Sequence, residues 1–100
     1  MNRKLQSLAR RIARIKGQLG ELGDLRPGSL SMQRRKWGGQ YYQLSYTHRG
    51  QGHTEYVPRD KRKLVEKQLA NHRRLRQLLQ EWIDLEIELC KLKLRQDSQD

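Results

Sequence analysis

The chain has 100 residues, which is enough for one small domain but excludes a large multidomain enzyme. Its 22 Lys and Arg against 11 Asp and Glu give a formal net charge of +11 at pH 7, which indicates an anionic partner such as a nucleic acid. Only 34% of the residues are hydrophobic and Phe is absent, so we expect a thin, elongated core within a single domain over residues 1–100.

The first predicted element is a helix at about residues 2–23. Its apolar residues recur at a spacing of 3-4-3-4-3, which places them on one stripe of a helix, as in a coiled coil. Gly17 and Gly20 lower the helix propensity, so we expect the helix to weaken there and to stop before Pro27. The stripe consists of Leu5, Leu8, Ile12, Ile15, Leu19 and Leu22.

A connector and a β-hairpin are predicted next. Residues 25–40 are rich in Gly, Ser and Pro, which is typical of a connector. Residues 41–48 then alternate between two faces, and residues 53–57 can return as a second strand after a turn. Because an isolated two-stranded hairpin is marginal in water, its apolar face should lie against the helix that follows. That contact would join Leu44 and the neighbouring tyrosines Tyr42 and Tyr46 to Leu64, Val65 and Leu69.

A second, longer helix is predicted at about residues 60–95. It follows Pro58, has Asp60 as a possible N-cap, and contains no further Gly or Pro. The spacing of the first helix recurs in its later half, so the sequence predicts an antiparallel pair. The predicted fold is therefore mainly α: a two-helix coiled-coil hairpin with a β-hairpin inserted between the helices. The second stripe consists of Leu75, Leu78, Trp82, Leu85, Leu89 and Leu92.

The second helix carries more apolar surface than one partner helix needs. A further stripe lies beside the first one, which indicates a second contact. Self-association into a four-helix arrangement is the simplest way to cover it, and a different protein partner would meet the same need. The residues of this stripe are Val65, Leu69, Leu79, Ile83, Ile87, Cys90 and Leu94.

The charge is distributed unevenly along the chain. Residues 1–76 carry a net charge of +14, and residues 77–100 carry −3. In an antiparallel pair the acidic side chains of the second helix would lie beside the basic first helix, where they can set orientation and register. The uncompensated charge is then the central part of the chain, from the connector to the start of the second helix.

This central region is the predicted nucleic-acid-binding surface. Arginines and lysines alternate there with aromatic side chains, and phosphates and exposed bases require these two kinds of group. The alternative is a solvated basic surface around a hairpin whose tyrosines are core. For Trp37, stacking on bases and anchoring of the connector remain equally open. The candidate residues, which we expect to converge at one end of the molecule, are Arg34, Arg35, Lys36, Trp37, Tyr41, Arg49, Arg59, Lys61, Arg62, Lys63, Arg73 and Arg74.

The sequence predicts no catalytic, cofactor-binding or metal site, and hence a protein that is not an enzyme. His48 and His53 could chelate an ion across a turn, but they lack a third ligand at metal-site spacing, which favours cross-strand or solvent-facing histidines. Cys90 on an apolar stripe is typical of a small buried hydrophobe. No segment resembles a signal sequence or the roughly 18 apolar residues of a membrane span, so we expect a cytoplasmic protein with no membrane partner.

Four short motifs lie in about the last three quarters of the chain. They are residues 27–30 (PGSL), 39–46 (GQYYQLSY), 55–58 (EYVP) and 71–75 (NHRRL). Together they resemble a family of small, functionally uncharacterised bacterial proteins commonly encoded beside transposases. The family usually carries a cluster of cysteines between the first two motifs, which looks like a metal knuckle, whereas this chain has none there. The resemblance implies a mobile-element context in which any nucleic-acid role depends on charge.

These patterns predict a non-enzymatic, basic, nucleic-acid-binding accessory protein, which the resemblance associates with mobile genetic elements. It would contact the phosphate backbone of DNA or RNA through its central basic region. The alternative is a coiled-coil protein-interaction module that docks on a larger nucleoprotein or transposition complex through the second helix. The sequence does not decide between DNA and RNA, and it does not define the sequence bound or the oligomeric state.

Overall fold

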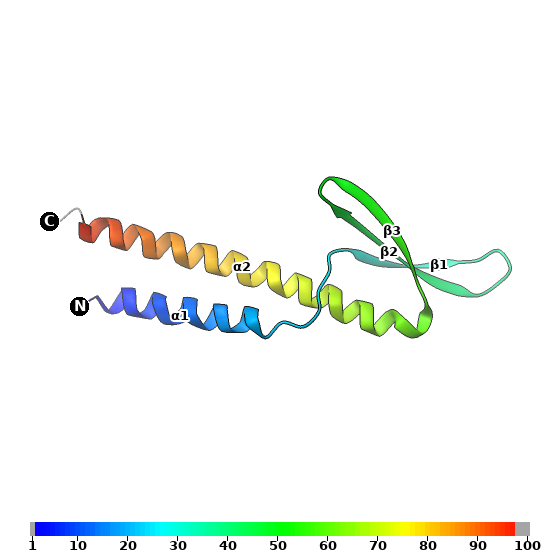
Figure 1. Ribbon diagram of the computed structural model, residues 1–100, viewed down its shortest axis with the longest axis horizontal. Coiled ribbons are helices and arrows are strands. Elements are labelled where there is room, and N and C mark those ends of the chain that lie inside the picture. The colour runs from blue at the N-terminus through cyan, green and yellow to red at the C-terminus, as the bar shows by residue number, and fades with distance from the viewer. Residues whose placement is uncertain (1, 98–100) are drawn as a thin grey trace. The chain divides into compact units, whose positions relative to one another are not determined.

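The computed structural model describes residues 2–97 and contains two α-helices, one short 3-10 helix and three β-strands (Figure 1). The elements form two compact units, and α2 contributes to both. The sheet unit runs over residues 23–73, and the helical unit comprises the described residues up to 22 and from 74 onward. In chain order the elements are α1 (Arg3–Gly20), β1 (Ser29–Arg34), β2 (Gln40–His48), β3 (Gln51–Val57), η1 (Arg59–Lys61) and α2 (Arg62–Asp97).

In the helical unit, α1 pairs with the later part of α2. Asn2 caps α1, because its Oδ1 accepts a hydrogen bond from the backbone N–H of Lys4 at 2.9 Å. Lys4 Nζ lies 3.1 Å from Glu88 Oε1, whereas Lys16, farther along α1, lies over the ring of Trp82. The residue nearer the start of α1 therefore contacts the residue farther along α2, so the two helices are antiparallel. Its core consists of the buried Leu8, Ile12, Ile15, Leu78 and Leu85, flanked by Leu19, Leu22, Trp82, Leu89 and Leu92.

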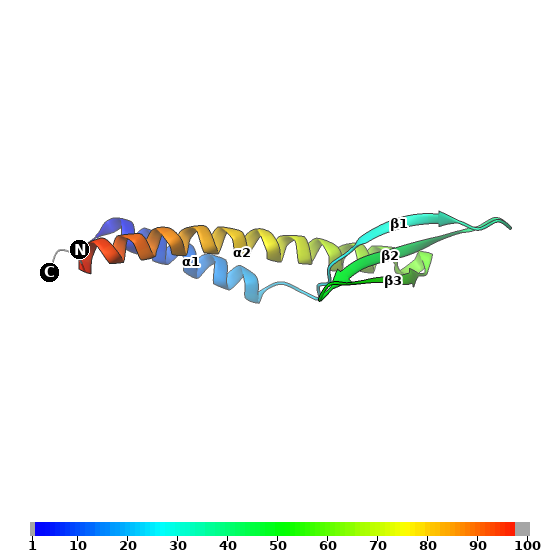
Figure 2. The same ribbon diagram turned by 90° about the horizontal axis from the view of Figure 1, so that it is seen from above.

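The sheet unit holds a three-stranded antiparallel sheet in the order β1-β2-β3 (Figure 2). β2 and β3 lie where the sequence predicts a hairpin, and they pair with Tyr42 opposite Val57. β1 lies within residues 25–40, which we predicted to be a connector, and it pairs with β2 so that Leu30 is opposite Leu44. The predicted fold, a two-helix coiled-coil hairpin with only a β-hairpin inserted, is therefore wrong.

The strand β1 was missed because its own sequence is a weak strand signal. Residues 29–34 read SLSMQR, with two apolar side chains, and they lie between Pro-Gly and Gly-Gly pairs that indicate turns. Pairing stabilises the strand: without β1, one edge of β2 would present unpaired backbone N–H and C=O groups. A third strand also makes the sheet more stable than an isolated hairpin.

One face of the sheet packs on the first part of α2. Leu44 is fully buried, and with Val57, Val65 and Leu69 it forms the core of this unit. Leu64, which we predicted to join this contact, is instead 53% exposed. It precedes Val65 directly, and consecutive residues of a helix point about 100° apart, so only one of the two faces the sheet. The partly buried Leu30, Tyr42 and Tyr46 complete the core.

The long helix α2 begins two residues later than predicted. Asp60, the predicted N-cap, lies inside η1, and α2 starts at Arg62. The backbone of Pro58 is extended, and its carbonyl accepts a hydrogen bond from the N–H of Lys61 at 3.0 Å. From Arg62 the helix continues for 36 residues to Asp97, since neither Gly nor Pro interrupts it.

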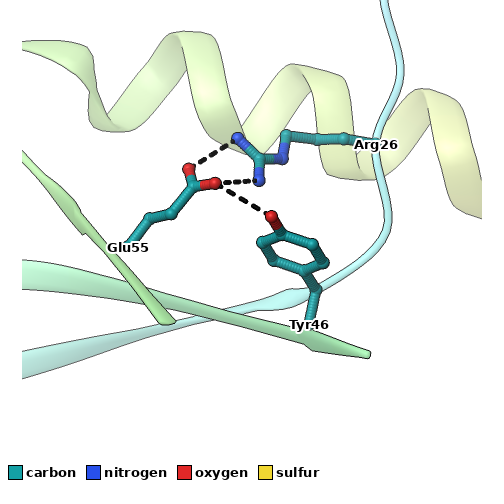
Figure 3. A network of polar contacts seen from close by, with 3 residues as sticks. All are labelled: Arg26, Tyr46 and Glu55. Atoms are coloured by element: carbon teal, nitrogen blue, oxygen red, sulfur yellow. Dashed lines mark hydrogen bonds and ion pairs between the residues drawn. The ribbon is translucent and has the colours of Figure 1, made fainter. Parts of the chain in front are cut away.

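A polar network ties the segment before β1 to β2 and β3 (Figure 3), and a further hydrogen bond ties this segment to α2. Arg26 donates from Nη1 to Glu55 Oε2 at 3.0 Å and from Nη2 to Oε1 at 3.1 Å. The Tyr46 hydroxyl also donates to Oε1 of Glu55, at 3.1 Å. On α2, Asn71 Nδ2 donates to the carbonyl of Asp24 at 2.8 Å. The hydrogen bonds from Arg26 and Tyr46 lower the pKa of the Glu55 carboxyl, and the bond to Glu55 raises the pKa of Arg26.

Replacing Glu55 with Gln is expected to lower the free energy of unfolding at neutral pH. Because the pKa of Glu55 in the folded protein lies below its ordinary value of 4.5, its stabilising contribution is present above that pH and is lost as the pH falls through the lowered pKa. The urea midpoints of wild type and Glu55→Gln should therefore differ most at neutral pH and converge in acid.

Glu66→Gln is the matched control for this prediction. It removes the same charge but breaks a single ion pair, with Arg62 four residues earlier in the same helix. Exposed pairs of this kind contribute little, so the control should shift the midpoint less. A difference between wild type and Glu55→Gln that stays constant from neutral to acid pH would contradict this role of Glu55.

Candidate nucleic-acid interface

The turn between β1 and β2 projects three of the predicted residues, Arg35, Lys36 and Trp37. The backbone N–H of Arg35 donates to the carbonyl of Gly39 at 3.1 Å, which closes the turn. Gly38 and Gly39 have φ of 90° and 87°, a conformation that favours glycine. Trp37 is 92% exposed. Of its two predicted roles, anchoring the connector in a core is therefore excluded within the described part of the chain.

Two tyrosines lie beside each other on the face of the sheet that α2 does not cover. The ring centroids of Tyr41 and Tyr56 are 5.7 Å apart, with an angle of 42° between the ring planes. The guanidinium of Arg35 lies 5.1 Å from the Tyr41 centroid and 5.9 Å from that of Tyr56. Tyr56, which is 59% exposed, was not among the predicted residues. Only the register of the β2–β3 pair, which the sequence pattern does not specify, identifies it: Tyr56 is opposite Gln43, two residues from Tyr41 on the same face.

The junction between β3 and α2 brings further cations to this end of the sheet. Since Arg34 pairs with Gln40 and Tyr42 pairs with Val57, the β1–β2 turn and the residues after β3 lie at the same end of β2 (Figure 1). All six cations gathered there are exposed, and we call them the basic end: Arg34, Arg35, Lys36, Arg59, Lys61 and Lys63.

Arg62 has a positioning role at this end. Its Nε donates to Glu66 Oε1 at 2.9 Å, and its Nη1 donates to the Tyr42 hydroxyl at 3.2 Å. The guanidinium also lies 5.4 Å from the centre of the Tyr42 ring. The hydrogen bond to Glu66 is the main cause of the raised pKa of Arg62. These contacts attach the start of α2 to β2, so the guanidinium is less available to a phosphate than the six cations of the basic end.

The structure places the other three predicted cations elsewhere. Arg49 lies in the β2–β3 turn, at the opposite end of β2, where it adopts a left-handed φ of 52°. Arg73 is the last residue of the sheet unit, and Arg74 belongs to the helical unit. Arg74 lines a surface hollow there with Arg11, Arg14, Glu81 and Asp84, among other residues. The predicted residues therefore do not all converge.

The basic end has little compensating negative charge in its own unit. Residues 23–73 contain 11 Lys and Arg against four Asp and Glu. Two of these carboxylates are already paired, Glu55 with Arg26 and Glu66 with Arg62. Among residues 2–97, none of the six cations of the basic end forms an ion pair. Their mutual repulsion is relieved by a polyanion or by salt.

The groups considered for metal or thiol chemistry are dispersed. His53 stacks on Tyr46, with ring centroids 4.9 Å apart, on the covered face of the sheet. Within the described residues, no three His, Cys, Asp or Glu side chains gather as metal ligands would. Cys90 is exposed on α2, whereas we predicted a buried thiol. The contacts of the candidate site are therefore ionic and aromatic.

Comparison of the chain with known protein families, with characterised proteins and with solved structures finds no match. Neither α1 nor α2, over the residues that the structure describes, has the combined length and apolarity that crossing a bilayer requires.

Proposed function

We propose that the protein binds nucleic acid without catalysing a reaction on it, and that the basic end of the sheet unit contacts the phosphate backbone. The single observation that carries this proposal is a cluster of six cations that form no ion pair among residues 2–97 and lie at one end of one sheet. They come from the end of β1, the β1–β2 turn and the junction between β3 and α2. Guanidinium and ammonium groups placed in this way bind successive phosphates, because each contact releases condensed counterions. The mobile-element setting that the resemblance of the four motifs implies fits such an accessory role.

Removing charge from the basic end is expected to weaken binding more than removing the same charge elsewhere. The test variant replaces Arg59, Lys61 and Lys63 with Gln. The affinity for a labelled oligonucleotide should fall about tenfold or more, and the slope of log K against log salt should become shallower by about 0.7 to 0.9 for each phosphate that the variant no longer neutralises. Fluorescence anisotropy at several salt concentrations measures both quantities.

The matched control replaces Arg10, Lys91 and Lys93 of the helical unit with Gln. It removes the same residue types and the same net charge, and all three side chains are exposed. An equal fall in affinity in the two variants would mean that binding depends on the net charge of the protein and not on the basic end. Absence of salt-sensitive binding of wild type to single-stranded DNA, duplex DNA and structured RNA would refute the proposal.

A second candidate function, docking of a protein through α2, is favoured by an exposed apolar face of the helical unit. The exposed fractions of the side chains on this face range from 38% at Leu79 to 70% at Leu94, and those of Ile83 and Ile87 lie between these values. Light scattering separates the candidates: a monomer that binds no nucleic acid would favour a missing partner protein, and a dimer would show that a second copy covers this face.

A further inference from the structure

We infer that the uncovered face of the sheet binds single-stranded RNA, with unstacked bases lying on the aromatic side chains beside the basic end; this inference rests on the proposed nucleic-acid binding. The starting observation is the position of Tyr41 and Tyr56. Both point to the face that α2 leaves open, with Arg35 against their rings. Aromatic rings and guanidinium planes are the surfaces on which bases of single strands stack.

The open face is suited to RNA in a second respect, because the three strands place no carboxylate on it. Side chains directly opposite each other in the sheet share a face, so the register assigns every strand residue to one side. The only Asp or Glu in the three strands is Glu55, which lies on the covered face opposite Leu44 and is paired with Arg26. A phosphate that approaches the open face therefore meets no repelling carboxylate from the sheet.

The remaining side chains of the open face are uncharged hydrogen-bonding groups. Gln43, Ser45 and Thr54 lie on this face and have no side-chain hydrogen bond within the described chain. Hydroxyl and amide groups both donate and accept, as a ribose 2′-hydroxyl does, and this hydroxyl is the group by which proteins distinguish RNA from DNA. The chemistry of the face therefore favours RNA over DNA.

The aromatic groups also favour binding of a single strand over binding of a duplex. In a duplex the faces of the bases are stacked on one another, so exposed rings on a protein gain nothing from them. Trp37, 92% exposed in the turn next to Arg35, offers a third ring at the basic end. The two tyrosine rings are inclined by 42°, so each ring serves a separate base.

The test compares Tyr56→Leu with Tyr56→Phe in the full chain. The probe is a labelled ten-nucleotide oligouridylate RNA, whose bases stack little on one another, with a DNA of the same sequence and an RNA duplex of equal length as further arms. Loss of the ring in Tyr56→Leu should weaken RNA binding about tenfold, whereas Tyr56→Phe, which keeps the ring, should bind as wild type does. Wild type should bind the RNA strand more tightly than the DNA strand or the duplex. Circular dichroism at the assay temperature verifies that both variants are folded.

The outcomes separate this inference from the proposed function. Salt-sensitive binding that Tyr56→Leu leaves unchanged, or that is as tight for the duplex, would overturn stacking on the open face while nucleic-acid binding itself stands. Equal affinity for the DNA strand and the RNA strand would overturn the preference for RNA. Absence of binding to all three probes would overturn both the inference and the proposed function.

Discussion

The Leu78→Ala variant is expected to lose about 2 to 5 kcal/mol of the free energy of unfolding. Leu78 has 0% exposure and lies in the core between α1 and α2, with Leu8, Ile12 and Ile15 from α1 in the same cluster. Removing its side-chain carbons reduces the apolar surface that is buried on folding and leaves a cavity that the two helices can only partly close. Urea unfolding followed by the helical circular dichroism signal measures this destabilisation.

Leu79→Ala is the matched control for Leu78→Ala, since it makes the same change one position along the same helix. Leu79 is 38% exposed and lies on the exposed apolar face of the helical unit, with Ile83, Ile87 and Leu94, and not in the core with α1. We expect it to cost less than about 1 kcal/mol, in keeping with a partly exposed side chain. Equal destabilisation at the two positions would contradict burial between α1 and α2 as the cause of the larger effect at Leu78, and would mean that the exposed apolar face of α2 is buried in solution.

The Gly28→Ala variant is expected to destabilise the sheet unit by a few kcal/mol and to abolish most of the proposed RNA binding. The φ of Gly28 is +136°, which L side chains rarely adopt, so the backbone strain alone costs about 1 to 3 kcal/mol. An added Cβ would also lie 2.9 Å from Leu44 Cδ1 and 2.9 Å from the carbonyl oxygen of Ser45. Overpacking of this kind typically adds about 1 to 3 kcal/mol to that cost, because β1 must shift away from β2.

Gly52→Ala is the control for Gly28→Ala. It lies in β3, its φ is not positive, and a Cβ there would meet nothing within 4 Å. We expect a change in the free energy of unfolding within about 0.5 kcal/mol. Urea unfolding of both variants and anisotropy of Gly28→Ala check this pair, and retention of stability and binding by Gly28→Ala would show that the close approach of residue 28 to β2 tolerates a side chain.

The apolar patterns of the helices could be interpreted without a structure. A spacing of 3-4-3-4-3 determines which side of a helix is apolar, and two stripes of equal length have one simple way to cover each other. Leu8 and Leu78, chosen by spacing, are both in the core of the helical unit. The alternation around Leu44 likewise identified the covered side of the sheet.

The strand β1 and the candidate interface could not be predicted in the same way. β1 depends on an edge of β2 that exists only once the sheet forms, so its own residues carry little of the signal. Tyr56 joins Tyr41 through the register of β2 and β3, and Arg49 is separated from Arg35 by the length of β2. Such distances depend on pairing between strands, which single-sequence patterns do not specify.

Composition and periodicity are local properties of the chain, so the excess of positive charge, its concentration before residue 77 and the apolar faces of the helices could be assigned from the amino-acid order alone. The tertiary structure alone decided which cations lie together. Six of them lie at one end of a three-stranded sheet, whereas Arg62 is paired with Glu66 and hydrogen-bonded to Tyr42. Two tyrosines lie beside each other on the open face. The physical reason is that strand pairing brings residues distant in the chain to the same edge and alternates their side chains between two faces.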